Sequence, residues 1–242
     1  MNFILDVHCH TVNSGHAYST VSENVAHAAK VGIQCIGISD HAPSMGGASH
    51  IYNFRNQWIL PKIINGVRVY KGVECNILDE NGLLDMPDDL LDEMEFVIAS
   101  FHRGTFVPVD MAMHTCAAIA AMENKNMHIW GHPADANFPV DIPAVVAAAA
   151  QTSTIIEINN QTLNPDSYRC NGNKDQLELL KYCKELKVPI LASSDAHFHE
   201  HVGELSRARE LILQSGIPEE QVLNTSAERF VAAIKKKRGL YK

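Results

Sequence analysis

The stretch FILDVHCH, residues 3–10, is a short apolar run that ends in two histidines separated by one residue. Comparable runs rich in β-branched residues follow about every thirty residues, at 34–39, 67–73, 96–101, 127–131, 154–158 and 188–193. Six of the seven runs end at or just before a histidine, aspartate or glutamate. Because the carboxyl ends of barrel strands converge, this pattern predicts metal-binding side chains gathered at one end of a barrel.

Helix-like patterns lie between most of these runs, at 22–31, 110–123, 141–151 and 175–187, and two more follow at 204–215 and 226–237. Alternating strands and helices predict βαβ units and a parallel sheet, and runs without clean alternation suit strands buried on both faces. We therefore predict an α/β fold, a distorted (β/α)7 barrel with its metal site at the carboxyl ends of the strands. An open doubly wound sheet is the alternative, but it would concentrate its site at one switch point.

The composition indicates one globular domain that spans residues 1–242, because the chain is 46% hydrophobic and 20% charged. The absence of a signal peptide, and of any apolar run of about 18 residues, predicts a cytoplasmic protein without membrane contact. The formal net charge of −8 argues against a nucleic-acid partner. These features leave the oligomeric state open.

The six cysteines form no C-x-x-C pair, so reduced thiols that pack in the core are expected. They are Cys9, Cys35, Cys75, Cys116, Cys170 and Cys183. Neighbouring residues of a strand point to opposite faces, so Cys9 should point away from any site that His8 and His10 share. The one basic run, residues 235–238, ends the last predicted helix, where cations complement the helix dipole. A phosphate-binding tail is the alternative for this run.

The pair His8 and His10 places two imidazoles on one face of a strand end, about 7 Å apart along the backbone. Asp195 and His197 repeat this spacing on the last run, and Glu74, which ends a central run, is the best candidate to bridge two ions. The other candidate ligands are His16, His41, His102 and His132. Each is weak evidence alone, but all of them converge if the runs form one barrel. Such nitrogen and oxygen ligands suit zinc, manganese and iron, and the ligand types alone do not separate these metals.

The segments DVHCHTVNSGHAYST, GISDHAP, GVECNI, ASFH, GHP, EINN and SSDAH together resemble the successive motifs of the PHP (polymerase and histidinol phosphatase) family. The similarity is greatest to its YcdX-type metal-dependent phosphatases and extends in order over nearly the whole chain. It implies a distorted seven-unit barrel with up to three metal ions, commonly zinc. One ion would bind His8, His10, Glu74 and Asp195; a second would bind Glu74, His102 and His132; a third would bind His16, His41 and His197. Arg103 departs from the pattern, because the closest relatives are expected to have an acid there.

A small phosphorylated substrate is predicted from charge. Three divalent ions would bring about +6 and two carboxylates −2, leaving roughly +4 for an anion with several oxygens. The predicted reaction is hydrolysis of a phosphomonoester by in-line attack of a metal-bridging hydroxide. The alternatives are a phosphodiesterase or nuclease, an amidohydrolase-like enzyme, and a metal-binding protein without catalysis. No basic stretch with interleaved aromatics supports a nuclease.

Four further residues are candidates to bind the phosphate: Arg103, Asn159, Asn160 and Arg169. The two asparagines could equally cap a helix or form a turn, and a surface arginine is common. Asp40 could orient His41 or a neighbouring ligand, or could instead cap a turn or helix. Five other histidines are expected to be structural or exposed to solvent. They are His27, His114, His128, His199 and His201.

Overall fold

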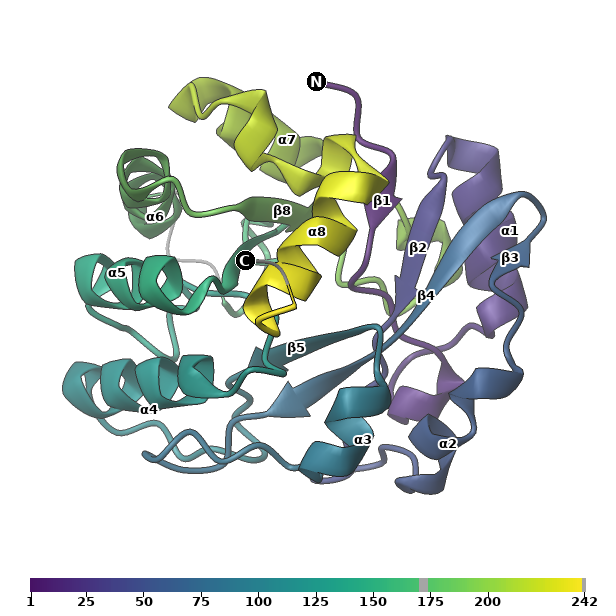
Figure 1. Cartoon of the computed structure of the whole chain (residues 1–242), viewed down its shortest axis with the longest axis horizontal. Coiled ribbons are helices and arrows are strands. Elements are labelled where there is room, and N and C mark those ends of the chain that lie inside the picture. Colours follow the sequence, from purple (N-terminus) through teal and green to yellow (C-terminus); the bar gives the residue numbers. More distant parts are fainter. Residues whose placement is uncertain (170–173, 241–242) are drawn as a thin grey trace.

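The structure is a computed structural model that describes residues 1–169 and 174–240 (Figure 1). Seven parallel strands lie in the order β1-β2-β4-β5-β6-β7-β8, and a short strand β3 pairs antiparallel with β4. Their bounds are β1 Leu5–Asp6, β2 Cys35–Ile38, β3 Ile63–Ile64, β4 Val67–Asn76, β5 Phe96–Ser100, β6 Ile129–Trp130, β7 Ile155–Asn159 and β8 Ile190–Ser193. The predicted distorted (β/α)7 barrel is confirmed, and the antiparallel strand is the addition that the sequence did not indicate.

The barrel closes between β1 and β8 without a regular ladder of hydrogen bonds. Just beyond the two strands, Cys9 and Ala196 form a single parallel bridge. Earlier along both strands, the Asn224 side chain lies between β1 and β8 and hydrogen-bonds to the backbone of each. Its Nδ2 donates to Leu5 O and Ala192 O, each at 2.8 Å, and its Oδ1 accepts from Ala192 N at 2.6 Å. One amide therefore satisfies backbone groups that short strands would leave unpaired.

Helices cover the outside of the sheet, as the alternating pattern predicted (Figure 1). Their bounds are α1 Val21–Val31, α2 Tyr52–Arg55, α3 Asp88–Glu93, α4 Met111–Glu123, α5 Ile142–Thr152, α6 Lys174–Leu186, α7 Ser206–Ser215 and α8 Ala227–Lys237. Asp110 and Asp141 cap α4 and α5 by accepting from backbone N–H groups of the first turn. Thr20 caps α1 in a capping box with Glu23. The short helices α2 and α3 were not predicted.

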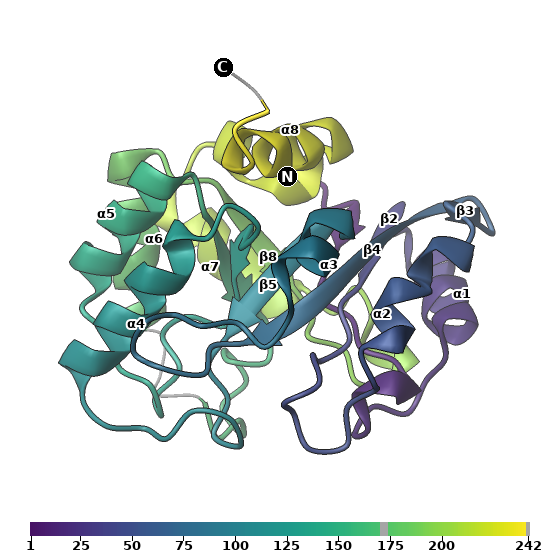
Figure 2. The ribbon, with the colours of Figure 1, turned by 60° about the horizontal axis from the view of Figure 1, so that its bottom comes forward.

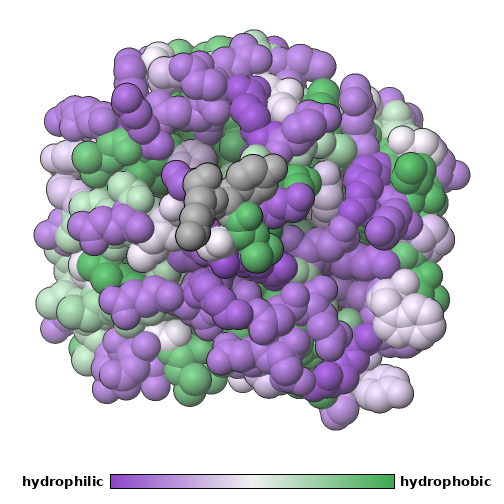
Figure 3. Space-filling view, viewed as in Figure 1, coloured by the Kyte–Doolittle hydropathy of each residue, from purple (hydrophilic) through white to green (hydrophobic). Residues whose placement is uncertain are grey.

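Helix α8 closes the end of the barrel where the strands begin, and the loops that follow the strands lie at the opposite end (Figure 2). Phe230 and Ile234 of α8 pack into the barrel interior against a cluster that includes Leu5, Phe96 and Leu191. Figure 3 shows that the face carrying α8 is mostly hydrophilic. The apolar side of α8 is thus turned inward, which anchors this helix by the burial of large side chains.

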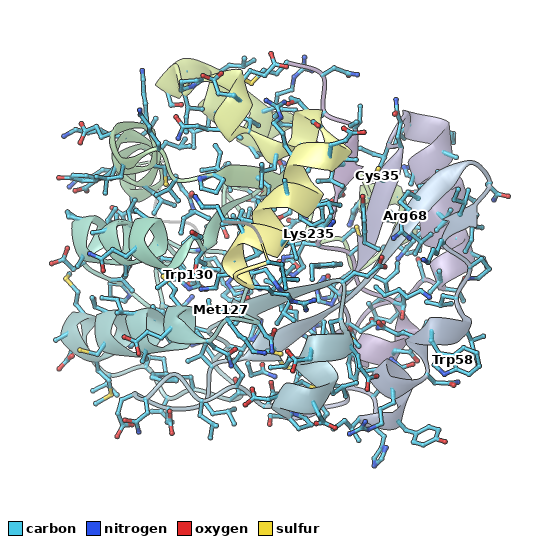
Figure 4. The ribbon with its side chains drawn as sticks, in the orientation of Figure 1. Cys35, Trp58, Arg68, Met127, Trp130 and Lys235 are labelled. Atoms are coloured by element: carbon cyan, nitrogen blue, oxygen red, sulfur yellow. The ribbon has the colours of Figure 1, made fainter. Side chains whose placement is uncertain are left out.

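The basic run at the end of α8 does more than complement its own helix dipole. Lys237 is buried, and its Nζ donates to Met122 O and, at 2.9 Å, to Thr154 Oγ1. Arg238 donates to Leu91 O at 3.0 Å and to Met94 O at 2.7 Å. In Figure 4, Lys235 lies on α8, and Cys35 and Arg68 lie on the neighbouring strands β2 and β4. Two of the four cations therefore fasten the last helix to carbonyls near the ends of α3 and α4.

The described cysteines are free thiols, as predicted: Cys9, Cys35, Cys75 and Cys183 are buried, and Cys116 is exposed. Cys9 belongs to the hydrophobic core, whereas its neighbours His8 and His10 face Glu74. The prediction for Cys170 falls outside the described residues. Within the described ranges, no helix is both long and apolar enough to span a lipid bilayer.

Candidate metal centre

All nine predicted ligands meet at the end of the barrel where the strands finish. His8 and His10 follow β1, His41 follows β2, and Glu74 lies within β4. The rest come from the segments after β1, β5, β6 and β8: His16, His102, His132, Asp195 and His197. Because consecutive parallel strands end at the same rim, ligands separated by up to 189 positions become neighbours.

Glu74 is the centre of the cluster. Its Oε2 lies 3.3 Å from His8 Nε2, 3.5 Å from His10 Nε2 and 2.8 Å from His41 Nδ1. Its other oxygen, Oε1, faces a different pair, His102 Nε2 at 3.3 Å and His132 Nε2 at 3.2 Å. The two oxygens of one carboxylate thus face two sets of imidazoles, which is the arrangement required of a carboxylate that bridges two ions.

Asp195 and the outer histidines complete the cluster. Asp195 Oδ1 lies 3.5 Å from His8 Nε2 and 3.2 Å from His10 Nε2. His16 Nε2 and His197 Nε2 are 3.0 Å apart. The ligand atoms of His10, His41 and His197 all lie within 4.8 Å of one another. His10 is therefore close to ligands of the third predicted ion as well as to those of the first.

Four buried polar atoms of this cluster have no hydrogen-bond partner: His8 Nε2, His10 Nε2, His41 Nδ1 and Glu74 Oε2. Each unsatisfied buried group costs about 1–3 kcal/mol, so four at one point require another source of stabilisation. A divalent cation supplies it, because imidazole nitrogen and carboxylate oxygen are its natural ligands. The residues present therefore fit the metal site that the sequence predicted.

The charges of the cluster suit cation binding. Burial alone would raise the pKa of Glu74, but His8, His102 and His41 hold it well below its usual value. Burial lowers the pKa of His10 well below its usual value, and the neighbouring His197 and His41 lower it further. Glu74 is therefore ionised and His10 neutral, the states in which their lone pairs can bind a metal.

Glu157, within β7, is a functional residue that the sequence reasoning missed. It is buried, and its Oε1 accepts from His8 Nδ1 at 2.6 Å and from Ser193 Oγ. Its Oε2 accepts from the backbone N–H of His132 and, at 3.2 Å, from Asn159 Nδ2. The proton on Nδ1 leaves the Nε2 lone pair of His8 directed toward Glu74. The available signal was a carboxylate inside the otherwise apolar run at 154–158.

Asp40 acts on His10 through Ser14. Ser14 Oγ donates to Asp40 Oδ1 at 2.7 Å, because a carboxylate can only accept. The same oxygen lies 3.0 Å from His10 Nδ1 and accepts from the His41 backbone N–H at 3.1 Å. With its single proton committed to Asp40, Ser14 must accept from His10 Nδ1. This fixes the tautomer in which His10 Nε2 carries the free lone pair.

His102 is oriented in the same way from another element. Its Nδ1 lies 2.8 Å from Asn76 Oδ1, and Asn76 Nδ2 donates to Asp85 Oδ2 at 2.6 Å. The amide oxygen can only accept, so His102 Nδ1 donates and Nε2 faces Glu74 with its lone pair. This role of Asn76 and Asp85 was not predicted from the sequence.

Two of the ligands have strained backbone conformations. His132 has φ 29° and Asp195 has φ 53°, both in the left-handed region that non-glycine residues rarely adopt. Such conformations cost about 1–3 kcal/mol each and persist where surrounding contacts fix them. At His132 the contact is the backbone N–H bond to Glu157. The strained turns aim both side chains into the cluster.

Arg169 is the phosphate-binding candidate that lies closest to the cluster. It is buried, and its Nη1 lies 2.6 Å from Asp195 Oδ2. Burial alone would lower the pKa of its guanidinium, but Asp195 raises it above its usual value, so Arg169 is cationic. It lines a cavity of ≈ 380 Å³ beside the histidines, together with His16, Gln161, Asn164, Asp166, Ser167, Tyr168, Asp195, His197 and His201.

The other three phosphate candidates have different surroundings. Asn159 Oδ1 accepts from the backbone N–H groups of Gln161 and Thr162, the turn role that the sequence left open, and its Nδ2 reaches Asp195 Oδ2 at 3.3 Å. Asn160 is used elsewhere, since its Oδ1 accepts from Arg207 N and Ala208 N at the start of α7. The helix-capping alternative therefore applies to Asn160. Arg103 is exposed in the turn after His102.

The histidines expected to be structural lie outside the cluster. His114 and His128 are buried and accept from the Val109 and Val97 backbone N–H groups, respectively. His199 Nδ1 lies 3.1 Å from Ser19 Oγ, and its ring is next to that of His27. His201 is exposed and lines the ≈ 380 Å³ cavity, so it alone of this set is close to the space beside the ligands.

Comparison with known proteins agrees with the fold. The chain belongs to the PHP domain family, whose profile matches residues 6–239. It is 40% identical over 238 residues to a probable phosphatase of Acetivibrio thermocellus, covering 98% of each chain. It is 41% identical over 239 residues to a probable phosphatase of Thermoanaerobacter sp. (strain X514), covering 98% of this chain and 97% of the relative.

Solved structures share the fold at lower identity. Histidinol phosphate phosphatase of Lactococcus lactis subsp. lactis, complexed with zinc, L-histidinol and phosphate, superposes with a TM-score of 0.68 and 18% identity. That match covers 88% of this chain and 94% of the other. A chain of an archaeal ribonuclease P with mature tRNA gives a TM-score of 0.58 and 14% identity, covering 98% and 92%. Similarity at this level shows the architecture alone.

Proposed function

We propose that this protein is a metal-dependent phosphatase that hydrolyses phosphomonoesters of small molecules. The proposal rests on four buried ligand atoms that have no hydrogen-bond partner, one in Glu74 and three in the histidines around it. They lie beside a cavity of ≈ 380 Å³ that Arg169 lines. Such a site holds cations and accepts an anion from the adjoining space. Hydrolysis of phosphoric esters agrees with the PHP domain family and with relatives named probable phosphatases over almost the whole chain.

Three divalent ions are proposed, held by the three ligand sets that the family resemblance implies. Zinc is the first choice because the ligands are imidazoles and carboxylates, and the Lactococcus lactis phosphatase was complexed with zinc. When bound, such ions would lower the pKa of a water molecule and neutralise charge on the phosphate oxygens.

The side chains of this protein would prepare and hold the reactants. Glu157, Ser14 and Asn76 fix the tautomers of three imidazoles, so that their lone pairs face the same space. Arg169 would bind the phosphate with its planar guanidinium, which suits a tetrahedral oxyanion better than a lysine does. Arg103 remains a candidate for this role, whereas the contacts of Asn159 and Asn160 favour turn and cap roles.

The cavity favours a small substrate over a polymer. A volume of ≈ 380 Å³ lies near the lower end of the range for small-molecule sites, about 300–1,000 Å³. The net charge of −8 also disfavours attraction of a polyanion. We therefore propose that the protein has no nucleic-acid partner. One domain over residues 1–242 and a cytoplasmic location remain predictions from the sequence.

The test is hydrolysis of an aryl phosphate monoester beside the matching diester by metal-reconstituted protein. We expect a monoester preference of about a hundredfold or more. His16→Ala and Asp195→Ala should abolish activity while the far-ultraviolet circular dichroism spectrum is retained. Asp110→Ala, which removes the cap of α4, is the matched control and should remain active. A diester preference would support a phosphodiesterase or nuclease, and no hydrolysis with metal bound would refute both.

A further inference from the structure

Three loops meet at Arg169, and one of them carries a carboxylate with no role in the metal cluster. Asp195 follows β8, Arg169 follows β7, and Asp135 lies in the loop after β6. Arg169 Nη1 lies 2.6 Å from Asp195 Oδ2, and Arg169 Nε lies 3.7 Å from Asp135 Oδ2. The guanidinium is therefore held between two carboxylates from different loops.

Asp135 is itself fixed in place. It is 5% exposed, and its Oδ1 accepts from the backbone N–H of Asn137 at 2.8 Å and from Asn137 Nδ2 at 2.7 Å. This leaves Oδ2 directed toward Arg169. A buried carboxylate is retained when a cation compensates it, and among the described residues the cation paired with Asp135 is Arg169.

The backbone of the two loops is joined as well. The N–H of Ala136 donates to Arg169 O at 3.1 Å, and Asn137 Nδ2 donates to Tyr168 O at 3.2 Å. Ala134, at the start of the loop, has φ 60°, a left-handed conformation for a residue with a side chain. A strained turn with this many cross-contacts is a rigid support rather than a passive connection.

Asp135 and Arg169 line different cavities. Arg169 lines the ≈ 380 Å³ cavity beside the histidines. Asp135 lines a separate cavity of ≈ 320 Å³ with Met111, Val140, Pro143 and Glu178. A substrate in the ≈ 380 Å³ cavity would contact Arg169. Asp135 would lie on a different side of Arg169, facing the ≈ 320 Å³ cavity.

We propose that Asp135 is a positioning residue that holds the Arg169 guanidinium toward the phosphate of the substrate. The inference rests on the proposed phosphatase function. Asp195 alone holds one side of the guanidinium, and Asp135 opposes it on the Nε side. With both carboxylates present, the plane of the guanidinium is fixed, which retains the geometry needed for paired hydrogen bonds to an oxyanion. Without Asp135, the side chain loses one of the two groups that orient it.

The test is a double-mutant cycle with Asp135→Asn, Arg169→Ala and the double variant, all loaded with metal. The measured quantities are kcat and KM for an aryl phosphate monoester and the inhibition constant of inorganic phosphate. Asp135→Asn should raise KM and the phosphate inhibition constant about tenfold while kcat changes less than about threefold. In the Arg169→Ala background, the same change should have almost no further effect, because the two residues act as one unit.

Two controls separate this role from loop folding. Asp141→Ala removes the cap of α5 from the same segment without a contact to Arg169, and it should leave KM and the phosphate inhibition constant unchanged. Metal content should be equal in all variants. Should Asp135→Asn fail to fold, Asn137→Ala replaces it in the cycle with changes in the same direction expected, because it removes the Nδ2 contact to Asp135 Oδ1 and keeps the backbone N–H contact.

Independent effects of the two substitutions, or an unchanged inhibition constant in Asp135→Asn, would overturn the positioning role while leaving the phosphatase proposal intact. Failure of the wild-type protein to hydrolyse the monoester is a different result, since it removes the function on which this inference rests.

Discussion

Replacement of Glu157 by glutamine tests whether the orientation of the ligands depends on this one carboxylate. Glu157 accepts four hydrogen bonds, two on each oxygen: His8 Nδ1 and Ser193 Oγ on Oε1, and His132 N and Asn159 Nδ2 on Oε2. A glutamine amide has one acceptor oxygen and one donor nitrogen. Two of the four existing donors therefore face the amide nitrogen instead of an acceptor, whichever way the amide is placed.

Each placement of the amide harms a different ligand. If the nitrogen faces His8, the imidazole must accept at Nδ1, and its proton moves to Nε2, the atom that faces Glu74 at 3.3 Å. If the nitrogen faces His132, two N–H donors meet at a residue whose backbone is already strained, with φ 29°. Loss of two buried bonds predicts a decrease of about 2–5 kcal/mol in the free energy of unfolding of the metal-free protein.

Metal affinity is the decisive measurement. Loss of a partner that orients a metal-binding histidine weakens binding by about 10- to 100-fold, equivalent to roughly 1.4–2.7 kcal/mol. The assay is metal content after dialysis against graded chelator concentrations, with zinc as the metal. Glu95→Gln is the control, since it removes the ion pair with Arg68 and should leave zinc content unchanged. A folded Glu157→Gln protein with wild-type zinc affinity would show that this carboxylate does not orient the ligands.

Contacts outside the ligands lead to three more predictions. Ser14→Ala breaks the link between Asp40 and His10 and should weaken zinc binding about tenfold; unchanged zinc content in the same dialysis assay would contradict it. Burial lowers the pKa of Lys237 from 10.5 to about 8, so its charge opposes folding fully below about pH 8 and this opposition is lost as the pH rises toward 10.5. Urea denaturation across this range should show wild type gaining stability relative to Lys237→Met, and parallel pH profiles would exclude the effect. Asn224→Ala removes three bonds across the β1–β8 junction and should lower the free energy of unfolding by about 2–4 kcal/mol, whereas equal urea midpoints would show that the junction closes without it.

Much of the site was predictable because its ligands share a sequence signal. Each stands at or soon after the end of an apolar run, and parallel strands bring those ends to one rim. The same reasoning could have found Glu157, because an acid within a buried strand needs a partner. It was missed because the prediction placed functional residues only at the ends of the runs.

Apart from Asp40, for which the sequence suggested an orienting role, the residues that orient the ligands had no such signal. Ser14 reaches Asp40 across 26 positions, and Asn76 reaches His102 across the same separation. Asn160 follows the sixth apolar run, and this position suggested a contact with phosphate. In the structure its side chain instead caps α7. Which way a side chain turns at a strand end depends on the loops around it.

The architecture and the candidate ligand set could be read from the sequence, because hydrophobic period, run length and residue type are local properties. The closure of the barrel through Asn224, the fastening of α8 by Lys237 and Arg238, and the approach of Asp135 to Arg169 emerged only in three dimensions. These contacts join residues separated by 32 to 219 positions. They depend on loop paths and on the direction of single side chains, and no periodic pattern encodes either.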